Sequence, residues 1–363
     1  MSEAVMNPET PASEEQWYRL GDDVDIVRRR NTLLLVAKRS GRSVRVSPVA
    51  MELLPLLRQG SSFEGLLTCL QKLRPEARDI QPKLAAFLSP LLNTGIVQQQ
   101  GGDVATATVR RRQYPLFDPN AIAQALALPL LLLPVRLRRV LYAGIPLAAA
   151  TLVAWLAWQQ QLPSLRYLME NMHWGGLLSF ALLVVPLHEA AHAIACRVTG
   201  IPVGAAGLIM HGGWMPGPYV DTSQSYRLVS RWPRFLIPAA GPWVNLTAAG
   251  ISAALLMTVD STSSWHALLQ TQLLWCLLFV FFDTTPLTAS DGSHCVEAWL
   301  DDELARRHAL TPTPKSDSAP PSANLRQEAD SGQRYRRVLF VHSFISAVLL
   351  LWWWFGGSTP IAL

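Results

Sequence analysis

Apolar residues gather in the C-terminal two-thirds of this chain, in runs long enough to cross a membrane. A spanning helix needs roughly 20 such residues. Five runs are at or near this length, at about 140–158, 175–196, 235–258, 267–282 and 338–355. A shorter run of roughly 14 residues, at 121–134, is expected to lie at the interface or to re-enter the bilayer. The pattern predicts a mainly α-helical polytopic membrane protein with about five spans.

The first hundred residues have a different pattern, with short strands followed by three helices. Strands are predicted at 25–28, 32–37 and 43–46, with a turn at Ser40-Gly41-Arg42. Helices are predicted from Ser47-Pro48, from Ser61-Ser62 and over about 82–93, before a closing strand from Gly95. This order predicts a small N-terminal α+β winged helix-turn-helix domain at residues 17–100.

The segments around these two parts complete the expected domain plan. Residues 1–16 are acidic with Ser and Pro, and residues 311–333 begin with a Pro- and Ser-rich stretch, so both are expected to be disordered. The plan is then a lead-in at 1–16, the winged helix at 17–100, a linker and interfacial helix at 101–139, a membrane core at 140–310, a cytosolic linker at 311–333, and a last span with a short outer tail at 334–363.

Composition and charge agree with a membrane protein and set its orientation. Half of the residues are hydrophobic, 16% are charged, and the formal net charge is +5. With the N-terminus in the cytoplasm, the outer loops and tail carry only Arg166, and the other basic residues between and after the spans face inward. The N-terminal stretch has no apolar core, so no signal peptide is expected and the first hundred residues are expected in the cytoplasm. The positive charge is therefore explained by orientation in the lipid bilayer, and no nucleic-acid partner is expected. The four cysteines do not have the spacing of a metal-binding motif.

The second apolar run contains two histidines and a glutamate, which are costly inside hydrocarbon and need a reason to be there. His188 and His192 are four residues apart, so on a helix they project from one face and can bind one Zn²⁺. Glu189 lies beside them and can act as a general base toward water. The sequence therefore predicts a zinc site with a catalytic carboxylate.

Two histidines leave a catalytic zinc site one protein ligand short. Asp291, near the cytosolic end of the fourth span, is the best third donor because its expected depth matches that of the histidines. Asp283 is an alternative, and His294 and Cys295 are weaker ones. Asp291 also has a structural interpretation, as the N-cap of a helix that starts at Gly292.

The third span carries Gly241, Pro242 and Asn245, and the segment before it, 200–233, is rich in Gly and Pro. Gly and Pro allow another backbone to come close, and Asn245 places an amide at membrane depth. The amide is expected to hold an extended peptide, or alternatively to bond to a neighbouring helix. Residues 200–233 are expected to form short strands and turns that line a cavity or lie at the interface.

These motifs together resemble the site-2 protease family of intramembrane zinc metallopeptidases. The resemblance covers about residues 175–300 and rests on His-Glu-x-x-His, Ala-Gly-Pro-x-x-Asn and Pro-x-x-x-x-Asp-Gly in this order. It implies that His188, His192 and Asp291 bind zinc, that Glu189 is the general base and acid, and that Asn245, with Gly241 and Pro242, binds substrate. Two positions depart from the family, with Asp283 in place of Asn and Ser290 in place of Leu.

Residues 17–100 resemble the PqqD-like family, also called the RiPP recognition element. The resemblance rests on the Ser40-Gly41-Arg42 turn, Val46-Ser47-Pro48, the 56–60 segment and the 91–97 segment. Such domains hold the leader of a precursor peptide as an added β-strand, pairing it with an exposed sheet edge. The alternatives are a domain that only covers the cytosolic face or one that binds DNA, and the candidate recognition helix has no basic stripe.

The expected function is intramembrane zinc proteolysis of a peptide or membrane-associated substrate near the cytosolic face, in maturation or export of a ribosomally made peptide. The expected place is the inner (cytoplasmic) membrane of a bacterium, and export-system components are possible partners. One alternative is regulated proteolysis of a signalling protein, although the periplasmic PDZ-like domain common in that branch has no room between the second and fourth spans. A non-catalytic peptide-binding accessory of an export system is another.

Overall fold

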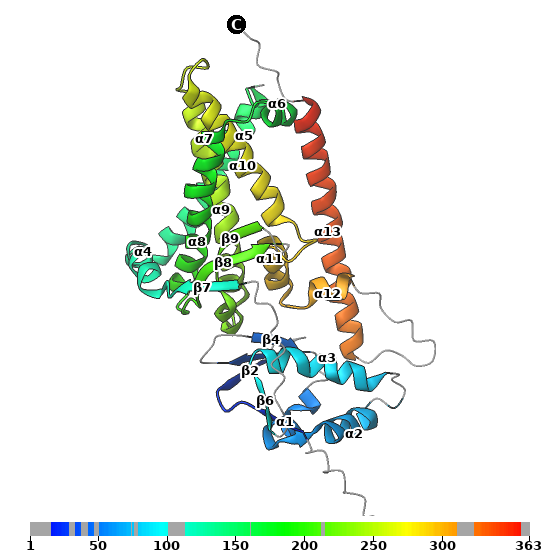
Figure 1. Cartoon of the computed structure of the whole chain (residues 1–363). Coiled ribbons are helices and arrows are strands. Elements are labelled where there is room, and N and C mark those ends of the chain that lie inside the picture. Colours follow the sequence, from blue (N-terminus) through cyan, green and yellow to red (C-terminus); the bar gives the residue numbers. More distant parts are fainter. Residues whose placement is uncertain are drawn as a thin grey trace, which may run out of the picture. The chain divides into compact units, whose positions relative to one another are not determined.

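A computed structural model describes residues 16–28, 33–37, 43–46, 51–73, 75, 79–100, 113–159, 161–211, 215–310 and 323–356. The chain divides into two compact units, Met1–Arg28 with Leu33–Arg110 and Arg29–Thr32 with Arg111–Leu363 (Figure 1). The expected lead-in at 1–16 lies almost wholly outside the described residues. The same is true of the turn at 40–42 and the helix start at 47–48.

The N-terminal unit is a small α+β domain built from two antiparallel three-stranded sheets. Its elements are β1 (Trp17–Leu20), β2 (Val24–Arg28), β3 (Leu33–Ala37), β4 (Ser43–Val46), α1 (Leu54–Gln59), β5 (Ser61–Ser62), α2 (Phe63–Leu73), α3 (Ile80–Asn93) and β6 (Val97–Gln100). The strand orders are β5-β1-β6 and β2-β3-β4. The predicted strands and helices recur in this order, but α1 starts at Leu54 and not at Ser47-Pro48, and Ser61-Ser62 form β5 before α2 starts at Phe63. The strands β1 and β5 are additions that the sequence pattern did not predict.

The core of this unit explains why its apolar positions fall where they do. All five residues of β3 are buried, as expected for a central strand whose sequence is an uninterrupted apolar run. In α3 the buried residues Leu84, Leu88 and Leu91 recur every three or four positions, so one helical stripe faces the sheets. The two-residue β5 and the four-residue β1 are too short to give a clear periodic signal.

The membrane unit contains the five predicted spans. Its helices are α4 (Asn120–Leu132), α5 (Val135–Trp158), α6 (Leu165–Glu170), α7 (Trp174–Ser179), the π-helical η2 (Phe180–Val184), α8 (Val185–Val198), the 3₁₀ helix η3 (Ser223–Arg227), α9 (Arg231–Leu256), α10 (Ser264–Thr284), α11 (Asp291–Leu300), α12 (Ala305–Leu310) and α13 (Ala323–Gly356). Among the described residues, five helical stretches are long and apolar enough to cross a membrane, with α7, η2 and α8 forming one of them. The short apolar α4 is the helix expected at 121–134.

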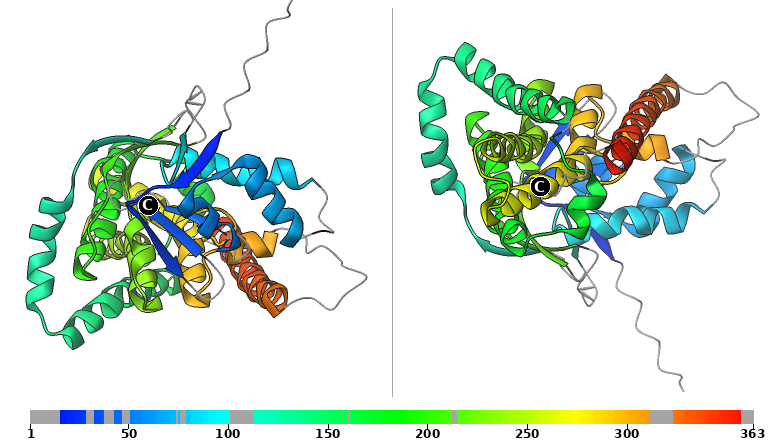
Figure 2. Two further views of the ribbon diagram at one scale, coloured as in Figure 1. Left: turned by 90° about the horizontal axis from the view of Figure 1, so that it is seen from below. Right: turned by 90° about the horizontal axis from the view of Figure 1, so that it is seen from above.

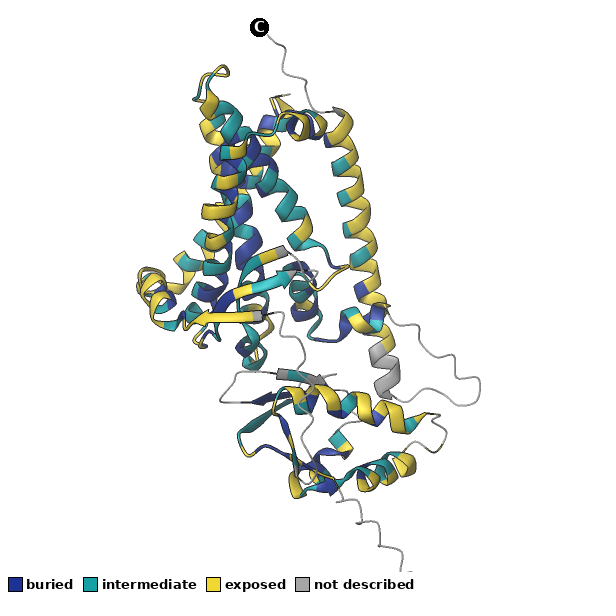
Figure 3. Ribbon diagram, viewed as in Figure 1, coloured by how far each residue is buried: buried dark blue, intermediate teal, exposed yellow. Residues whose placement is uncertain are grey.

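The third span, α9, is the most enclosed helix of the membrane unit and packs against α5, α8, α10 and α11. Half of its apolar window is buried, whereas 6% of the window of α13 is buried (Figure 3). Small residues allow the close packing, since a Cβ on Gly250 would lie 2.6 Å from the Cβ of Ala149 in α5. Viewed along the bundle, α4 and α5 lie on its outer side (Figure 2). Side chains on α9 are therefore held from several directions.

A third antiparallel sheet lies in the membrane unit, and it corrects the expected linker. Its order is β7 (Gln113–Phe117), β8 (Ala206–His211), β9 (Met215–Val220). The strands and turns predicted within 200–233 are confirmed, but 113–117 is a strand and not linker. The linker expected at 311–333 is also partly wrong, because α13 begins at Ala323 and only 311–322 lies outside the described residues. In both places a structured element is formed by polar or mixed residues that the apolar pattern does not mark.

Candidate metal centre

The second span brings its two histidines to one buried point. His188 and His192 lie one turn apart on α8 and are 8% and 6% exposed. Their Nε2 atoms are 3.2 Å apart. The π-helical turn η2 comes directly before α8, a feature that is frequent at functional sites in helices. The spacing argument from the sequence therefore holds in the fold.

Asp291 completes a group of three possible metal ligands with these histidines. Its Oδ2 lies 3.2 Å from Nε2 of His188 and 3.3 Å from Nε2 of His192. Donors arranged tetrahedrally around zinc at ~2.0–2.1 Å stand ~3.3 Å from one another. The three donor atoms thus have the separations that a tetrahedral zinc site requires, with one position left over.

Local helix chemistry places Asp291. It is the first residue of α11, whose N-cap is Ser290, and Ser290 and Ser293 form a reciprocal capping box. Gly292 follows, and a Cβ there would clash with the backbone of Thr284 at the end of α10. Asp291 is therefore not the N-cap, and the alternative interpretation of it is wrong. Ser290, a departure from the family pattern, supplies the cap that fixes the next residue.

The second nitrogen of each histidine has its own partner. Nδ1 of His192 donates to the backbone oxygen of Ile237 at 2.8 Å, because a carbonyl can only accept. This tautomer leaves Nε2 unprotonated, as a metal ligand must be. Nδ1 of His188 lies 3.6 Å from Oδ2 of Asp283. Asp283 therefore sits behind His188, outside the group of three donors, and the geometry favours Asp291 as the third ligand.

The third span meets the metal centre at Gly241. A Cβ at this position would clash with Nε2 of both His188 and His192, so only glycine lets α9 approach. Asn245 is 1% exposed, and its Nδ2 donates to Oδ2 of Asp283 at 2.7 Å. Its Oδ1 has no hydrogen-bond partner among the described residues. The structure thus shows the interhelical bond of Asn245, while the roles of Asn245, Gly241 and Pro242 in substrate binding stay predictions.

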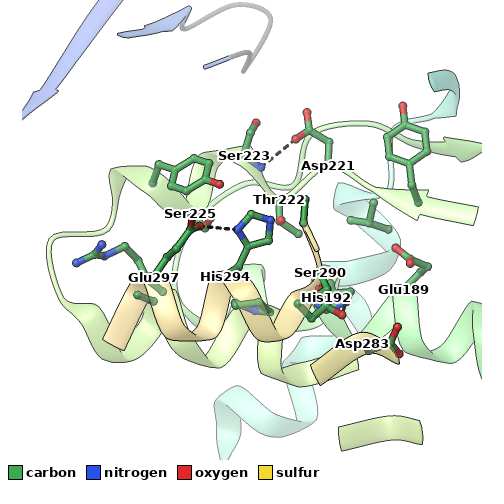
Figure 4. Close-up of a pocket in the computed structure, with 18 of the residues that line it drawn as sticks. Glu189, His192, Asp221, Thr222, Ser223, Ser225, Asp283, Ser290, His294 and Glu297 are labelled. Carbon is green, nitrogen blue, oxygen red and sulfur yellow. Dashed lines mark hydrogen bonds and ion pairs between the residues drawn. The ribbon is translucent and has the colours of Figure 1, made fainter. Parts of the chain in front are cut away.

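A cavity of about 520 Å³ opens onto the histidines. It is lined by His188, Glu189, His192, Ile209, Pro218, Tyr219, Val220, Asp221, Thr222, Ser223, Ser225, Tyr226, Arg234, Pro238, Asp283, Ala289, Ser290, Asp291, His294, Glu297, Ala298 and Glu303. Figure 4 shows Glu189 and His192 on one side of it and His294 with Glu297 on the other. The backbone of Val220, at the end of β9, hydrogen-bonds to Glu189. Glu189 therefore faces the space that a substrate would enter.

The weaker ligand candidates point elsewhere. Nδ1 of His294 pairs with Oε2 of Glu297 at 3.1 Å (Figure 4). Burial, with Asp291 nearby, raises the pKa of the Cys295 thiol, whose sulfur lies 3.7 Å from the backbone oxygen of Phe235. A thiol that stays protonated is a poor zinc ligand, because the thiolate is the form that binds metal. Neither residue joins the group of three donors within the described part of the chain.

The charge state of Asp291 suits a metal ligand. Burial by itself would raise the pKa of this carboxyl, but His192 and His188, when they are protonated, outweigh burial through their positive charge and their hydrogen bonds and hold the pKa well below its usual range. The carboxylate is therefore ionised at neutral pH. Sequence reasoning missed two partners that orient this site, the Ile237 carbonyl and the Val220 backbone, because backbone groups leave no signal in a sequence. It also missed the partner of His294, although Glu297 is an acidic residue three positions away on the same helix.

The geometry defines a class of protein: a membrane-embedded hydrolase with two histidines and an aspartate at a common point and a glutamate beside them. In agreement, residues 176–347, slightly less than half of the chain, match the sequence model of peptidase family M50. This segment is an M50 domain, of the site-2 protease family, and the chain is a site-2 protease-like zinc metalloprotease. The match does not include residues 17–100, where the PqqD-like resemblance stays a prediction. No curated protein and no solved structure matches the chain.

Replacing Gly241 by alanine should disrupt this centre without touching a ligand. The added methyl group would meet both histidine Nε2 atoms, so α9 and α8 would have to separate. We expect Gly241→Ala to lose bound zinc, measured by metal analysis of the purified protein. Gly144→Ala is the matched control, because no atom lies within 4 Å of a Cβ built there. Full zinc content in Gly241→Ala would contradict the tight approach.

Proposed function

We propose that the chain is an intramembrane zinc endopeptidase that cleaves a peptide or membrane-associated substrate near the cytosolic face, in maturation or export of a ribosomally made peptide. The observation that carries it is the group His188, His192 and Asp291 with Glu189 beside it at the wall of one cavity. Arginines between the second and third spans and after the fourth support a cytosolic position for this end of the bundle. They also support an inner-membrane protein with its N-terminus in the cytoplasm.

Each side chain of the site has a separate role in the proposed peptide hydrolysis. Zinc held by His188, His192 and Asp291 would polarise the substrate carbonyl and acidify water. Glu189 takes a proton from the attacking water and returns it to the amine that leaves when the C–N bond breaks. The Ile237 carbonyl and Asp283 keep the imidazoles turned toward Asp291. Proton transfer of this kind contributes roughly 10²–10⁴-fold to a rate.

The strand β9 is a suitable place for the substrate backbone. A helical segment has its carbonyls occupied by i to i−4 bonds, so it must unwind before cleavage. In the described part of the chain β9 is an edge strand of its sheet, and Pro218, Tyr219 and Val220 line the cavity. Because Pro216 and Pro218 have no N–H, an extended peptide that adds to this edge would donate its own N–H groups to the carbonyls of β9. We infer that the unwound substrate lies between β9 and Glu189.

The N-terminal unit supports a substrate that is presented by its leader. Its two sheets have β2, β4, β5 and β6 at their edges within the described residues, and an edge can take up a peptide as an added strand. The PqqD-like resemblance of residues 17–100 is the ground for proposing a precursor leader as that peptide. The partners proposed are therefore a precursor peptide, the lipid bilayer and components of an export system, with no nucleic acid.

Deletion of residues 1–100 tests the substrate class. The full-length protein, in lipid nanodiscs, should cleave a ribosomal precursor peptide that carries a leader, and the truncated protein should show a KM that is roughly tenfold higher, with zinc content unchanged. The measurement is cleavage at increasing peptide concentration, with a leaderless version of the same peptide as control. Equal KM values for the two proteins would remove the recognition role, and no cleavage by either would contradict this substrate.

A further inference from the structure

The third metal-ligand candidate is placed by a short loop, and the last span reaches that loop. Residues 285–290 join the end of α10 to Asp291 at the start of α11. Tyr335 of α13 is fully buried, and its hydroxyl donates to the backbone oxygen of Pro286 at 2.6 Å. We propose that Tyr335 is a positioning residue, which holds this loop so that the carboxylate of Asp291 meets His188 and His192. The inference rests on the proposed zinc role of these three residues.

The loop is held on both sides of Pro286, which makes the tyrosine contact effective. The hydroxyl of Ser290 donates to the carbonyl of Thr285, so the loop closes on itself. The capping box of Ser290 then fixes the first turn of α11, and Gly292 packs tightly against Thr284. Pro286 is buried between these points, where its carbonyl needs a donor. A loop so constrained transmits a shift at Pro286 to Asp291.

The cytosolic end of α13 is docked firmly enough to place the hydroxyl. One turn before Tyr335, the hydroxyl of Ser331 donates to the buried carboxylate of Asp302. A Cβ on Gly332 would lie 2.9 Å from the backbone of His308, so α13 crosses α12 at close range. The ring of Tyr335 fills a small cluster with Ala305 and Ala309. Figure 1 shows α12 alongside this end of α13.

The rest of α13 packs little against its own unit, so this contact is a specific attachment and not part of a broad interface. The apolar window of the helix is 6% buried (Figure 3). At the far end, Nε1 of Trp353 donates to the backbone oxygen of Pro163 at 2.9 Å, and Trp353 is 3% exposed. The helix thus has a buried side-chain donor on a proline carbonyl near each end. Of these two donors, only Tyr335 touches the loop at 285–290, so Trp353 serves as a control for the general docking of α13.

The test compares Tyr335→Phe with Trp353→Phe in the full-length protein. Tyr335→Phe keeps the ring in its cluster and removes only the hydroxyl. We expect its zinc affinity, measured without substrate by competition with a chromophoric chelator, to fall about tenfold, the lower end of the effect of removing a partner that orients a ligand. Its kcat should fall with an unchanged KM, and the visible spectrum of the cobalt-substituted protein should change. Trp353→Phe should keep the wild-type zinc affinity and cobalt spectrum.

Each outcome separates this inference from the function on which it rests. Wild-type zinc affinity and cobalt spectrum in Tyr335→Phe, with wild-type protein that binds zinc and cleaves peptide, would overturn the inference alone. An equal loss of affinity in both variants would also overturn it, because the effect would then be general docking of α13. A wild-type protein that binds no zinc would overturn the proposed function, and the role of Tyr335 with it.

Discussion

Glu189→Gln is expected to lower kcat by roughly 10²–10⁴-fold while the protein keeps its zinc. The substitution changes one oxygen to an amide nitrogen, so the shape of the side chain is preserved and its ability to take a proton is lost. Glu189 is not in the group His188, His192 and Asp291, and it lies on the cavity wall against Val220. The loss should therefore appear in proton transfer and not in metal binding.

The experiment measures peptide cleavage and zinc content on the same purified samples. Glu170→Gln is a control of identical chemistry, since Glu170 is an exposed residue that pairs with Arg166 away from the cavity. It should cleave at the wild-type rate. A Glu189→Gln protein that cleaves at that rate would remove the proton-transfer role, and one that has lost its zinc would show that Glu189 supports the metal.

The pair of histidines could be predicted from the sequence because its geometry is local. Four residues of helix bring two side chains to the same face whatever the rest of the fold does. The apolar run around His188 and His192 also excluded a solvated surface helix. The structure adds that both imidazoles point toward α9, where Gly241 leaves room for them. The glycine was expected to allow close approach, but the atoms that approach are those of the histidines.

Other elements could not be predicted, because their partners are distant along the chain. The strand β7 is a five-residue segment that becomes a strand by pairing with β8, more than 80 residues later. The polar start of α13 lies beyond the apolar window, and its buried positions Ser331 and Tyr335 are defined by Asp302 and Pro286. The periodicity of apolar residues predicts which faces are buried in lipid or in the core. It cannot predict elements that are held by specific polar contacts.

The choice between two aspartates also required the fold. Asp283 and Asp291 are eight residues apart, and from the sequence both remained possible ligands. The end of α10 at Thr284 and the new helix start at Ser290 turn the chain between them, so the two carboxylates reach His188 from different sides. Asp291 meets Nε2 and Asp283 faces Nδ1. One aspartate can thus bind the metal while the other orients its ligand and holds Asn245.

This division of roles gives a matched pair of substitutions, Asp291→Asn and Asp283→Asn. Removing a carboxylate that only orients a ligand costs roughly 10–100-fold in metal affinity. Asp283→Asn should lie at the low end of that range, because the new amide oxygen can still accept from Asn245. Asp291→Asn should exceed the range and leave no measurable cleavage, since the anionic donor itself is gone.

Zinc affinity by chelator competition is the deciding measurement, because it does not depend on the substrate. If Asp283→Asn loses zinc while Asp291→Asn retains it, the ligand is Asp283 and the two aspartates have exchanged roles. If both lose it equally, Asp283 contributes far more than orientation of His188. We expect Asp291→Asn to bind zinc much more weakly than Asp283→Asn. The reason is geometric, because a single Asp291 oxygen lies 3.2 and 3.3 Å from the two histidine nitrogens that are free to bind the metal.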